Sequence, residues 1–222
     1  MSDADVRRPV AAWVWGGGLL VLAAVLPAIG SGGGMSGAPH TILAWVQKLA
    51  FAASMAVFAF GLRGRGSVVA RRPSGVIALL LVGVILPLLD ALTSWVFVVD
   101  PDAPGAIPDW IGTAQIVTYA GLALWGAAAL VATAQIARVD AVAYPWRWAP
   151  LAGLGVLAVV FLGLQVIGTT TAGDGDSGAA AVLVGTWGAV TVLVPLALGV
   201  LALALGARGV SVPARQVYPP VA

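Results

Sequence analysis

The sequence contains no cysteine, no glutamate and a single histidine, His40, among its 222 residues. Without thiols the chain can form neither disulfides nor cysteine-based zinc or catalytic centres. One histidine cannot supply both ligands of a bis-histidine haem, and a zinc site would also lack ligands. We therefore expect no metal and no cofactor, and we interpret His40 as an interfacial residue.

Charged side chains are also scarce, since 9% of the residues are charged and 60% are hydrophobic. The mean hydropathy is +1.01. Soluble domains carry roughly 25% charged residues, so this composition is typical of a protein embedded in a lipid bilayer. The bilayer is the expected partner, and we expect no nucleic-acid partner.

Long apolar runs make up most of the chain. A helix needs about 20 apolar residues to cross the hydrocarbon core, where every backbone N–H and C=O must be satisfied within the segment. We predict an all-α fold, a six-transmembrane-helix bundle forming one integral membrane domain, with Thr41, Ser74 and Asp109 as N-caps. The expected spans are residues 10–30, 41–62, 75–99, 110–137, 148–170 and 180–205.

Arginine is confined to alternate connections. All ten arginines lie in the two tails or in the second and fourth loops, and the other three loops have none. Cytoplasmic loops are enriched in Lys and Arg, so we expect both termini to be cytoplasmic in a bacterial plasma membrane. Tryptophan placement agrees, because only Trp125 would lie deep. An alternative is that the first span is a secretory signal sequence, given Arg7, Arg8 and the small residues after Pro27.

Lys48 and Asp90 are the only charged residues inside the expected spans. At about 1.5 Å per residue, they lie roughly 10 Å and roughly 14 Å from the outer ends of their helices. A lysine stem can span this difference, and pairing is the least costly arrangement for opposite charges in lipid. We therefore predict an ion pair between the second and third spans.

Other polar side chains fall in the outer half of the bundle, whereas the inner half is almost wholly apolar. A conduit needs wettable surface along its whole length, so this asymmetry predicts an outward-facing polar pocket on a sealed base. The predicted cluster consists of Gln47, Lys48, Asp90, Ser94, Gln115, Tyr119 and Gln165.

Three functions fit such a cluster. The function we expect is non-enzymatic binding of a small ligand, a lipid or a partner membrane protein. A secondary transporter is an alternative, in which Asp90 takes up a proton and Pro27, Pro87 and Pro195 are flexing points. The polar residues could instead be structural, since interhelical hydrogen bonds contribute only about 0.6 to 2 kcal/mol each.

A remote alternative is an intramembrane hydrolase. It would use Ser94 as nucleophile and a deprotonated Lys48 as base. A carboxylate at Asp90 would keep the amine charged and disable this base, so we do not expect an enzyme.

Four arginines, Arg63, Arg65, Arg71 and Arg72, lie together in the loop between the second and third spans. Near an anionic membrane surface, each would contribute about 1 kcal/mol of attraction. The cluster could therefore bind anionic lipid headgroups, or it could serve only to fix topology.

Several short motifs carry a resemblance to a known family. They are Leu26-Pro27 before a glycine-rich loop, Gly61-Leu62-Arg63 at the end of the second span, Asp100-Pro101, and Trp110-Ile111-Gly112 at the start of the fourth. With these motifs the chain resembles a bacterial six-span integral membrane family, that of domain of unknown function 998. The resemblance implies six spans over most of the chain and supplies no catalytic residue. In that family, histidines follow the glycine that opens the fourth span, whereas Thr113-Ala114-Gln115 stands here.

Overall fold

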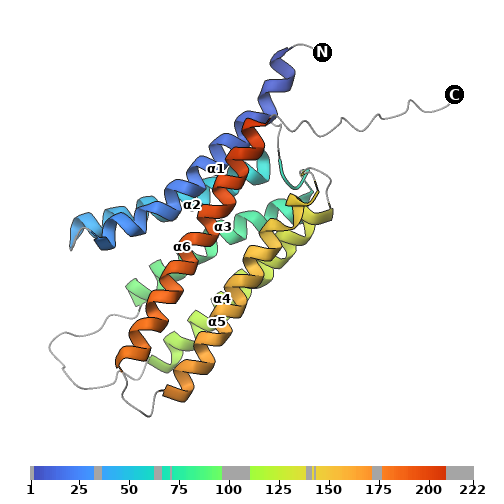
Figure 1. Ribbon diagram of the computed structural model, residues 1–222. Helices are drawn as coiled ribbons and strands as arrows, with labels where there is room; N and C mark the ends of the chain where they lie inside the picture. The colour runs from blue at the N-terminus through green and yellow to red at the C-terminus, as the bar shows by residue number, and fades with distance from the viewer. Residues whose placement is uncertain are drawn as a thin grey trace.

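In the computed structural model the described part of the chain forms six long α-helices and one short 3-10 helix (Figure 1). The structure describes residues 3–32, 37–62, 67–70, 72–96, 111–138, 142, 144–171 and 177–208, and it has no strand within these ranges. The elements are α1 (Asp3–Gly32), α2 (Ala38–Phe60), α3 (Pro73–Val96), α4 (Ile111–Arg138), η1 (Trp146–Trp148), α5 (Ala149–Thr171) and α6 (Ser177–Ala207).

All six long helices have the length and apolar composition needed to cross a bilayer. The chain is therefore a multi-pass membrane protein, and the predicted all-helical bundle of six spans is confirmed. Most helix ends lie within three residues of the predicted bounds. The exception is α1, which begins at Asp3 rather than at residue 10.

Two of the predicted N-caps, Thr41 and Ser74, are wrong, and the third, Asp109, lies outside the described residues. Thr41 lies inside the first turn of α2, where its Oγ1 donates to the carbonyl of Gly37 over 3.3 Å. Ser74 lies inside α3, which begins at Pro73. Proline is favoured at the first helical positions because its missing N–H would have no partner there. Pro39 and Pro73 therefore begin these helices earlier than the expected caps.

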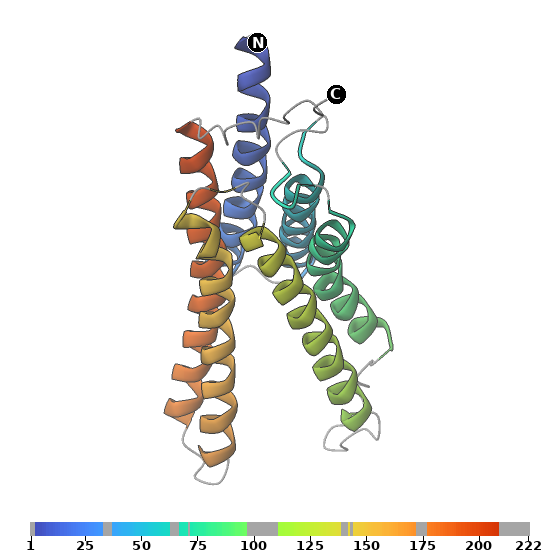
Figure 2. The ribbon, with the colours of Figure 1, turned by 90° about the vertical axis from the view of Figure 1, so that its right-hand side faces the viewer.

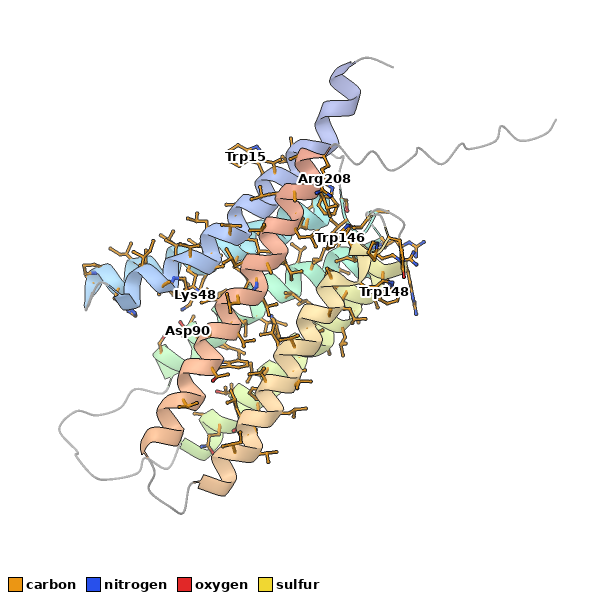
Figure 3. The ribbon with its side chains drawn as sticks, in the orientation of Figure 1. Trp15, Lys48, Asp90, Trp146, Trp148 and Arg208 are labelled. Atoms are coloured by element: carbon orange, nitrogen blue, oxygen red, sulfur yellow. The ribbon has the colours of Figure 1, made fainter. Side chains whose placement is uncertain are left out.

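The six helices form a ring in chain order. Each packs against its neighbours in sequence, and α1 packs against α6 to close the ring. Among the described residues no two helices approach one another across the ring. The start of α1 and the end of α6 lie at one end of the bundle, here called the terminal end (Figures 1 and 2). Trp15 and Arg208 mark this end (Figure 3), and the opposite end is called the distal end.

Contacts around the ring are uneven. α1 and α6 meet at two glycines, because a Cβ atom at Gly17 would lie 2.8 Å from the carbonyl oxygen of Gly199. α1 and α2 are joined by the buried Ser54, whose Oγ donates to the carbonyl of Gly16 over 2.8 Å. α4 and α5, by contrast, touch little and diverge toward the distal end (Figure 2).

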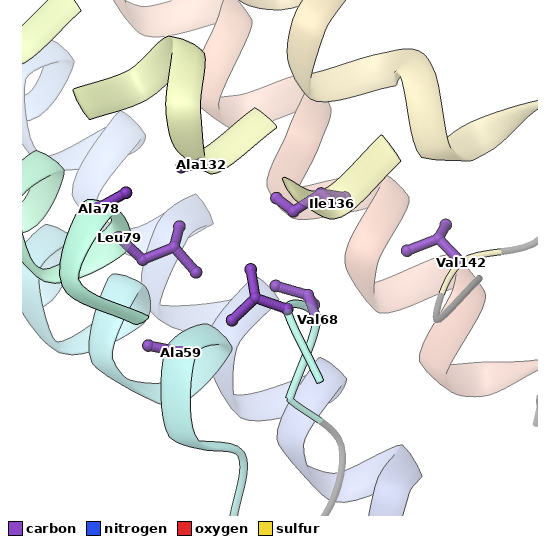
Figure 4. Packing of buried hydrophobic residues seen from close by; sticks show 8 residues of the cluster. Ala59, Val68, Ala78, Leu79, Ala132, Ile136 and Val142 are labelled. Carbon is purple, nitrogen blue, oxygen red and sulfur yellow. The ribbon is translucent and has the colours of Figure 1, made fainter. Parts of the chain in front are cut away.

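The terminal end is filled by an apolar core. Residues 67–70, which follow α2, fold inward, and Val69 is 0% exposed. The backbone N–H of Val68 donates to the carbonyl of Phe58 over 3.0 Å, and this bond holds the segment in place. The core therefore packs this segment against α2, α3 and α4 at the terminal end. Its buried members are Ala59, Val68, Val69, Ala78, Leu79, Ala132, Ile136 and Val142 (Figure 4).

Candidate functional site

The ring of helices encloses a cavity of about 1270 Å³ that is partly open to the outside. All six long helices contribute to its wall. Six helices in a ring leave more central space than their side chains fill, and many wall residues are small. Among them are Ala24, Ala129, Gly188 and Ala202.

Polar side chains line this cavity mainly at its distal end. His40, Gln47 and Lys48 come from the first half of α2, and Asp90 comes from the second half of α3. The rest of the wall is almost wholly apolar down to the core of the terminal end. The cavity thus has a short polar region and a long apolar region.

Lys48 and Asp90 form an ion pair, in which the Nζ of Lys48 donates to the Oδ2 of Asp90. The two side chains come from neighbouring helices and point toward one another (Figure 3). The predicted pairing is therefore confirmed. The ammonium group also lies 5.0 Å from the ring centroid of Trp45, within the range of a cation–π interaction.

Both members of the pair have capacity for further hydrogen bonds. The Asp90 side chain is 56% exposed, and within the described residues its Oδ1 has no donor. The Lys48 side chain is 24% exposed. Its ammonium has three N–H donors, of which one is used by Oδ2. A bound molecule with a donor for Asp90 and an acceptor for Lys48 would use this remaining hydrogen-bonding capacity.

The helix beneath Asp90 is interrupted by Pro87. Proline cannot donate to the carbonyl four residues earlier, so α3 lacks a backbone hydrogen bond at Gly83. One residue away, the Nε1 of Trp125 donates to the carbonyl of Val82 over 3.2 Å and connects α4 to this part of α3. From sequence, Trp125 is expected to lie deep in the membrane, and no role follows from its position alone. Because an indole N–H away from water needs an acceptor, its depth already indicates a hydrogen bond to another part of the protein.

His40, like Trp125, lines the cavity although the sequence did not predict it there. It was interpreted as interfacial because no second metal ligand accompanies it. It is exposed at the start of α2 and lines the polar end of the cavity. Its position about two turns before Lys48 on the same helix indicates that it lies near the ion pair.

Four members of the predicted cluster do not join the ion pair. Ser94, Gln115, Tyr119 and Gln165 are exposed and do not line the cavity, whereas Gln47 does. The Oγ of Ser94 donates to the carbonyl of Ala91 in its own helix, over 3.0 Å. The prediction that all these side chains gather in one pocket is therefore corrected.

The physical reason is the divergence of the helices. Gln115 is seven residues from Leu122 and therefore shares its helix face, and Leu122 lines the cavity. Gln165 likewise shares a face with Leu154. Both glutamines lie two or three turns nearer the distal end, where α4 and α5 have separated (Figure 2). Both are exposed there and do not line the cavity.

The predicted headgroup cluster lies largely outside the described residues. Arg63, Arg65 and Arg71 are not described, and Arg72 is exposed at the terminal end. At the same end, the guanidinium of Arg147 lies 5.5 Å from the ring centroid of Tyr144 and 5.8 Å from that of Trp148. Trp146 and Trp148 are exposed beside it (Figure 3). Such aromatic and cationic groups are typical of a membrane interface.

No family model, no curated protein and no solved structure matches the chain. The resemblance to a six-span family therefore stays a prediction, and the function has to be inferred from the geometry of the cavity.

Proposed function

We propose that this multi-pass membrane protein binds an amphiphilic ligand in its central cavity. The polar head of the ligand lies at Lys48 and Asp90, and its apolar part lies along the rest of the wall. The observation that carries this proposal is the distribution of side chains, because His40, Gln47, Lys48 and Asp90 lie at one end of a long, mainly apolar cavity. Thr133 and Thr191 also line the cavity, but each donates its hydroxyl to carbonyls of its own helix.

The chemistry of the wall argues against other ligand classes. A small polar solute would leave most of the wall without an apolar partner, and apolar surface is stabilised by contact with apolar groups. A wholly apolar ligand would leave the free oxygen of Asp90 without a donor, at the cost of an unmade hydrogen bond. An amphiphile satisfies both regions at once.

The apolar terminal end favours binding over passage. Val68, Val69 and Ile136 belong to the apolar core there, and Val68 and Ile136 also line the cavity. A polar substrate that left through this end would have to pass these apolar side chains, which argues against a secondary transporter that protonates Asp90. A purely structural role for the ion pair is the competing proposal, and the experiment below separates it from ligand binding.

The same proposal includes the orientation of the protein. The ten arginines lie in the tails and in the two loops of the terminal end, which supports a cytoplasmic terminal end in a bacterial plasma membrane. The cavity would then open toward the exterior leaflet. A cytoplasm-dependent reporter fused after Ala222 should be active, and an inactive reporter would overturn the orientation.

The experiment compares bound molecules in the wild type and the double variant Lys48→Met/Asp90→Asn. Removing both charges leaves neither one unpaired, so the bundle should stay folded. Native mass spectrometry of protein purified in mild detergent should detect one bound amphiphile per wild-type chain. The double variant should lose at least nine-tenths of this occupancy, because the head has lost its charged partners.

Gln115→Leu is the matched control, because it removes a polar group of the same half of the bundle that lies outside the cavity. This variant should retain the ligand. Equal occupancy in the wild type and the double variant would contradict the assigned head site. A wild type that carries no ligand would favour the structural role.

A further inference from the structure

We infer that the ligand is a two-chain membrane lipid with a zwitterionic headgroup, and that it enters the cavity sideways from the bilayer between α4 and α5. This inference rests on the proposed function and names the class of ligand and its route.

The route is indicated by the weak seam between α4 and α5. These helices touch little, and no residue of the α5 span between Trp146 and Ile167 is buried. Leu154 packs against the apolar cluster between α3 and α4. Toward the distal end the two helices diverge (Figure 2). Leu122 on α4 and Leu157 on α5 line the cavity there.

The seam lies at the depth of the hydrocarbon core. Leu157 is eight residues from the first residue of α5, which corresponds to roughly 12 Å along the helix. A water-soluble molecule passing at this depth would have to lose its hydration. A lipid already in the bilayer would move its chains from one apolar environment to another. The position of the seam therefore favours a ligand that comes from the membrane.

The size of the cavity favours two chains over one. Pockets that hold drug-sized molecules measure about 300 to 1,000 Å³. The cavity of about 1270 Å³ is larger, and its apolar region extends from the ion pair to the core of the terminal end. A single short chain would leave much of this space unfilled.

The charge of the site favours a headgroup without net charge. Lys48 and Asp90 neutralise each other, so a net-charged head would bring an uncompensated charge into a medium of low dielectric constant. A phosphoethanolamine head has no net charge. Its phosphate can accept from the free N–H groups of Lys48, and its ammonium can donate to the Oδ1 of Asp90. A phosphoglycerol head has a net negative charge and lacks the ammonium.

Lipid selectivity is measured after reconstitution into vesicles of equal parts phosphatidylethanolamine and phosphatidylglycerol. The protein is then extracted into mild detergent, and its bound lipids are identified by native mass spectrometry. The wild type should retain phosphatidylethanolamine at least tenfold over phosphatidylglycerol. Equal retention, or a preference for phosphatidylglycerol, would overturn the assignment of the headgroup.

A pair of glycine variants tests whether the lipid occupies the cavity. Gly188 lines the cavity, and a Cβ atom there would meet nothing within 4 Å. The substitution Gly188→Leu therefore has room for its Cβ atom and adds a bulky side chain to the wall of the cavity, so it should reduce lipid retention. Gly163 on α5 has the same free space but lies outside the wall, so Gly163→Leu should retain lipid as the wild type does. Equal retention in the two variants would contradict binding in the cavity.

The route is tested by the rate at which bound lipid exchanges with deuterated phosphatidylethanolamine vesicles. Leu157→Trp places a large side chain at the seam and should slow exchange at least fivefold. Val159→Trp is the control, because Val159 is 71% exposed on the same helix and does not line the cavity. Equal exchange rates in the two variants would overturn the sideways route.

The outcomes separate this inference from the proposed function. If the wild type retains a different amphiphile, and Lys48→Met/Asp90→Asn releases it, the proposed function stands and the lipid assignment fails. If the wild type retains nothing, both fail.

Discussion

A hydroxyl group in a transmembrane helix can bond either to its own helix or to a neighbour, and only the second choice joins two helices. Ser54 bonds to a neighbouring helix, because its Oγ donates to the carbonyl of Gly16, and the residue is 0% exposed. Ser94 bonds within its own helix, because its Oγ donates to the carbonyl of Ala91, and the residue is exposed. The two serines therefore differ in what they contribute to stability.

Ser54→Ala should destabilise the folded bundle by about 0.6 to 1.7 kcal/mol, the range measured for interhelical hydrogen bonds in membrane proteins. Ser94→Ala should change the free energy of unfolding by less than about 0.5 kcal/mol. Reversible unfolding in mixed micelles measures both. Equal effects of the two substitutions would contradict the interhelical role of Ser54.

The ion pair could be predicted from sequence, whereas the rest of the polar cluster could not. Lys48 and Asp90 are the only charges inside the spans expected from sequence, and the cost of an isolated charge in lipid requires a partner. No such requirement applies to Gln115, Tyr119 and Gln165. Uncharged polar groups toward the end of a helix can face the headgroup region at little cost. The residue number gives the depth of each side chain in the bilayer, but it does not tell whether the side chain faces the cavity or the outside of the bundle.

At the scale of helices, the sequence determines the spans but not all of their contacts. Short loops make successive helices neighbours, which accounts for five of the six contacts of the ring. The contact of α1 with α6 depends on the close approach at Gly17 and Gly199. With 29 glycines in the chain, nothing in the sequence distinguishes these two from the others.

Gly199→Ala should weaken the closure of the ring. The added Cβ atom would lie 2.8 Å from the Cγ2 of Val21 and 3.0 Å from the carbonyl oxygen of Gly17. Backbone cannot move aside without separating the helices, so we expect a loss of about 1 to 3 kcal/mol in unfolding free energy.

Gly185→Ala on the same helix is the control for the ring contact, because a Cβ atom at Gly185 would meet nothing within 4 Å. It should be neutral or slightly stabilising, since alanine is a better helix former. Equilibrium unfolding in micelles compares the pair. A Gly199→Ala protein as stable as Gly185→Ala would show that α1 and α6 are not in close contact.

The segment that closes the terminal end was also not predicted. From sequence, residues 63–72 are expected to form an arginine-rich loop outside the membrane. Within it, Val68 and Val69 are adjacent apolar residues, and the structure buries both beneath α3. A Cβ atom at Gly75 in α3 would lie 2.8 Å from Val69, so this glycine makes room for the segment. The apolar pair was the signal for an inward fold.

For the whole molecule, the sequence predicts a polar pocket in the outer half of the bundle, but it does not predict a cavity lined by all six long helices. In soluble proteins an apolar stripe on each helix identifies the face that points inward. Here lipid surrounds the bundle and apolar residues line the cavity, so both faces of each helix are apolar. The pattern therefore predicts a membrane helix without indicating how far apart the helices stand.

The arrangement of the whole molecule is one-sided. The terminal end has an apolar core, and the distal end has the ion pair and the diverging helices. This arrangement suits an amphiphile, because one end can hold the head and the apolar remainder can hold the chains. A channel would need polar surface along its whole length.

The most direct test of the account is the electron density of the cavity in crystals grown from a lipid phase containing phosphatidylethanolamine. A lipid in the cavity should give elongated non-protein density that begins at Lys48 and Asp90 and continues along the apolar wall past Leu157. A ring centre filled by side chains, or the ammonium and carboxylate facing different sides of the bundle, would contradict it.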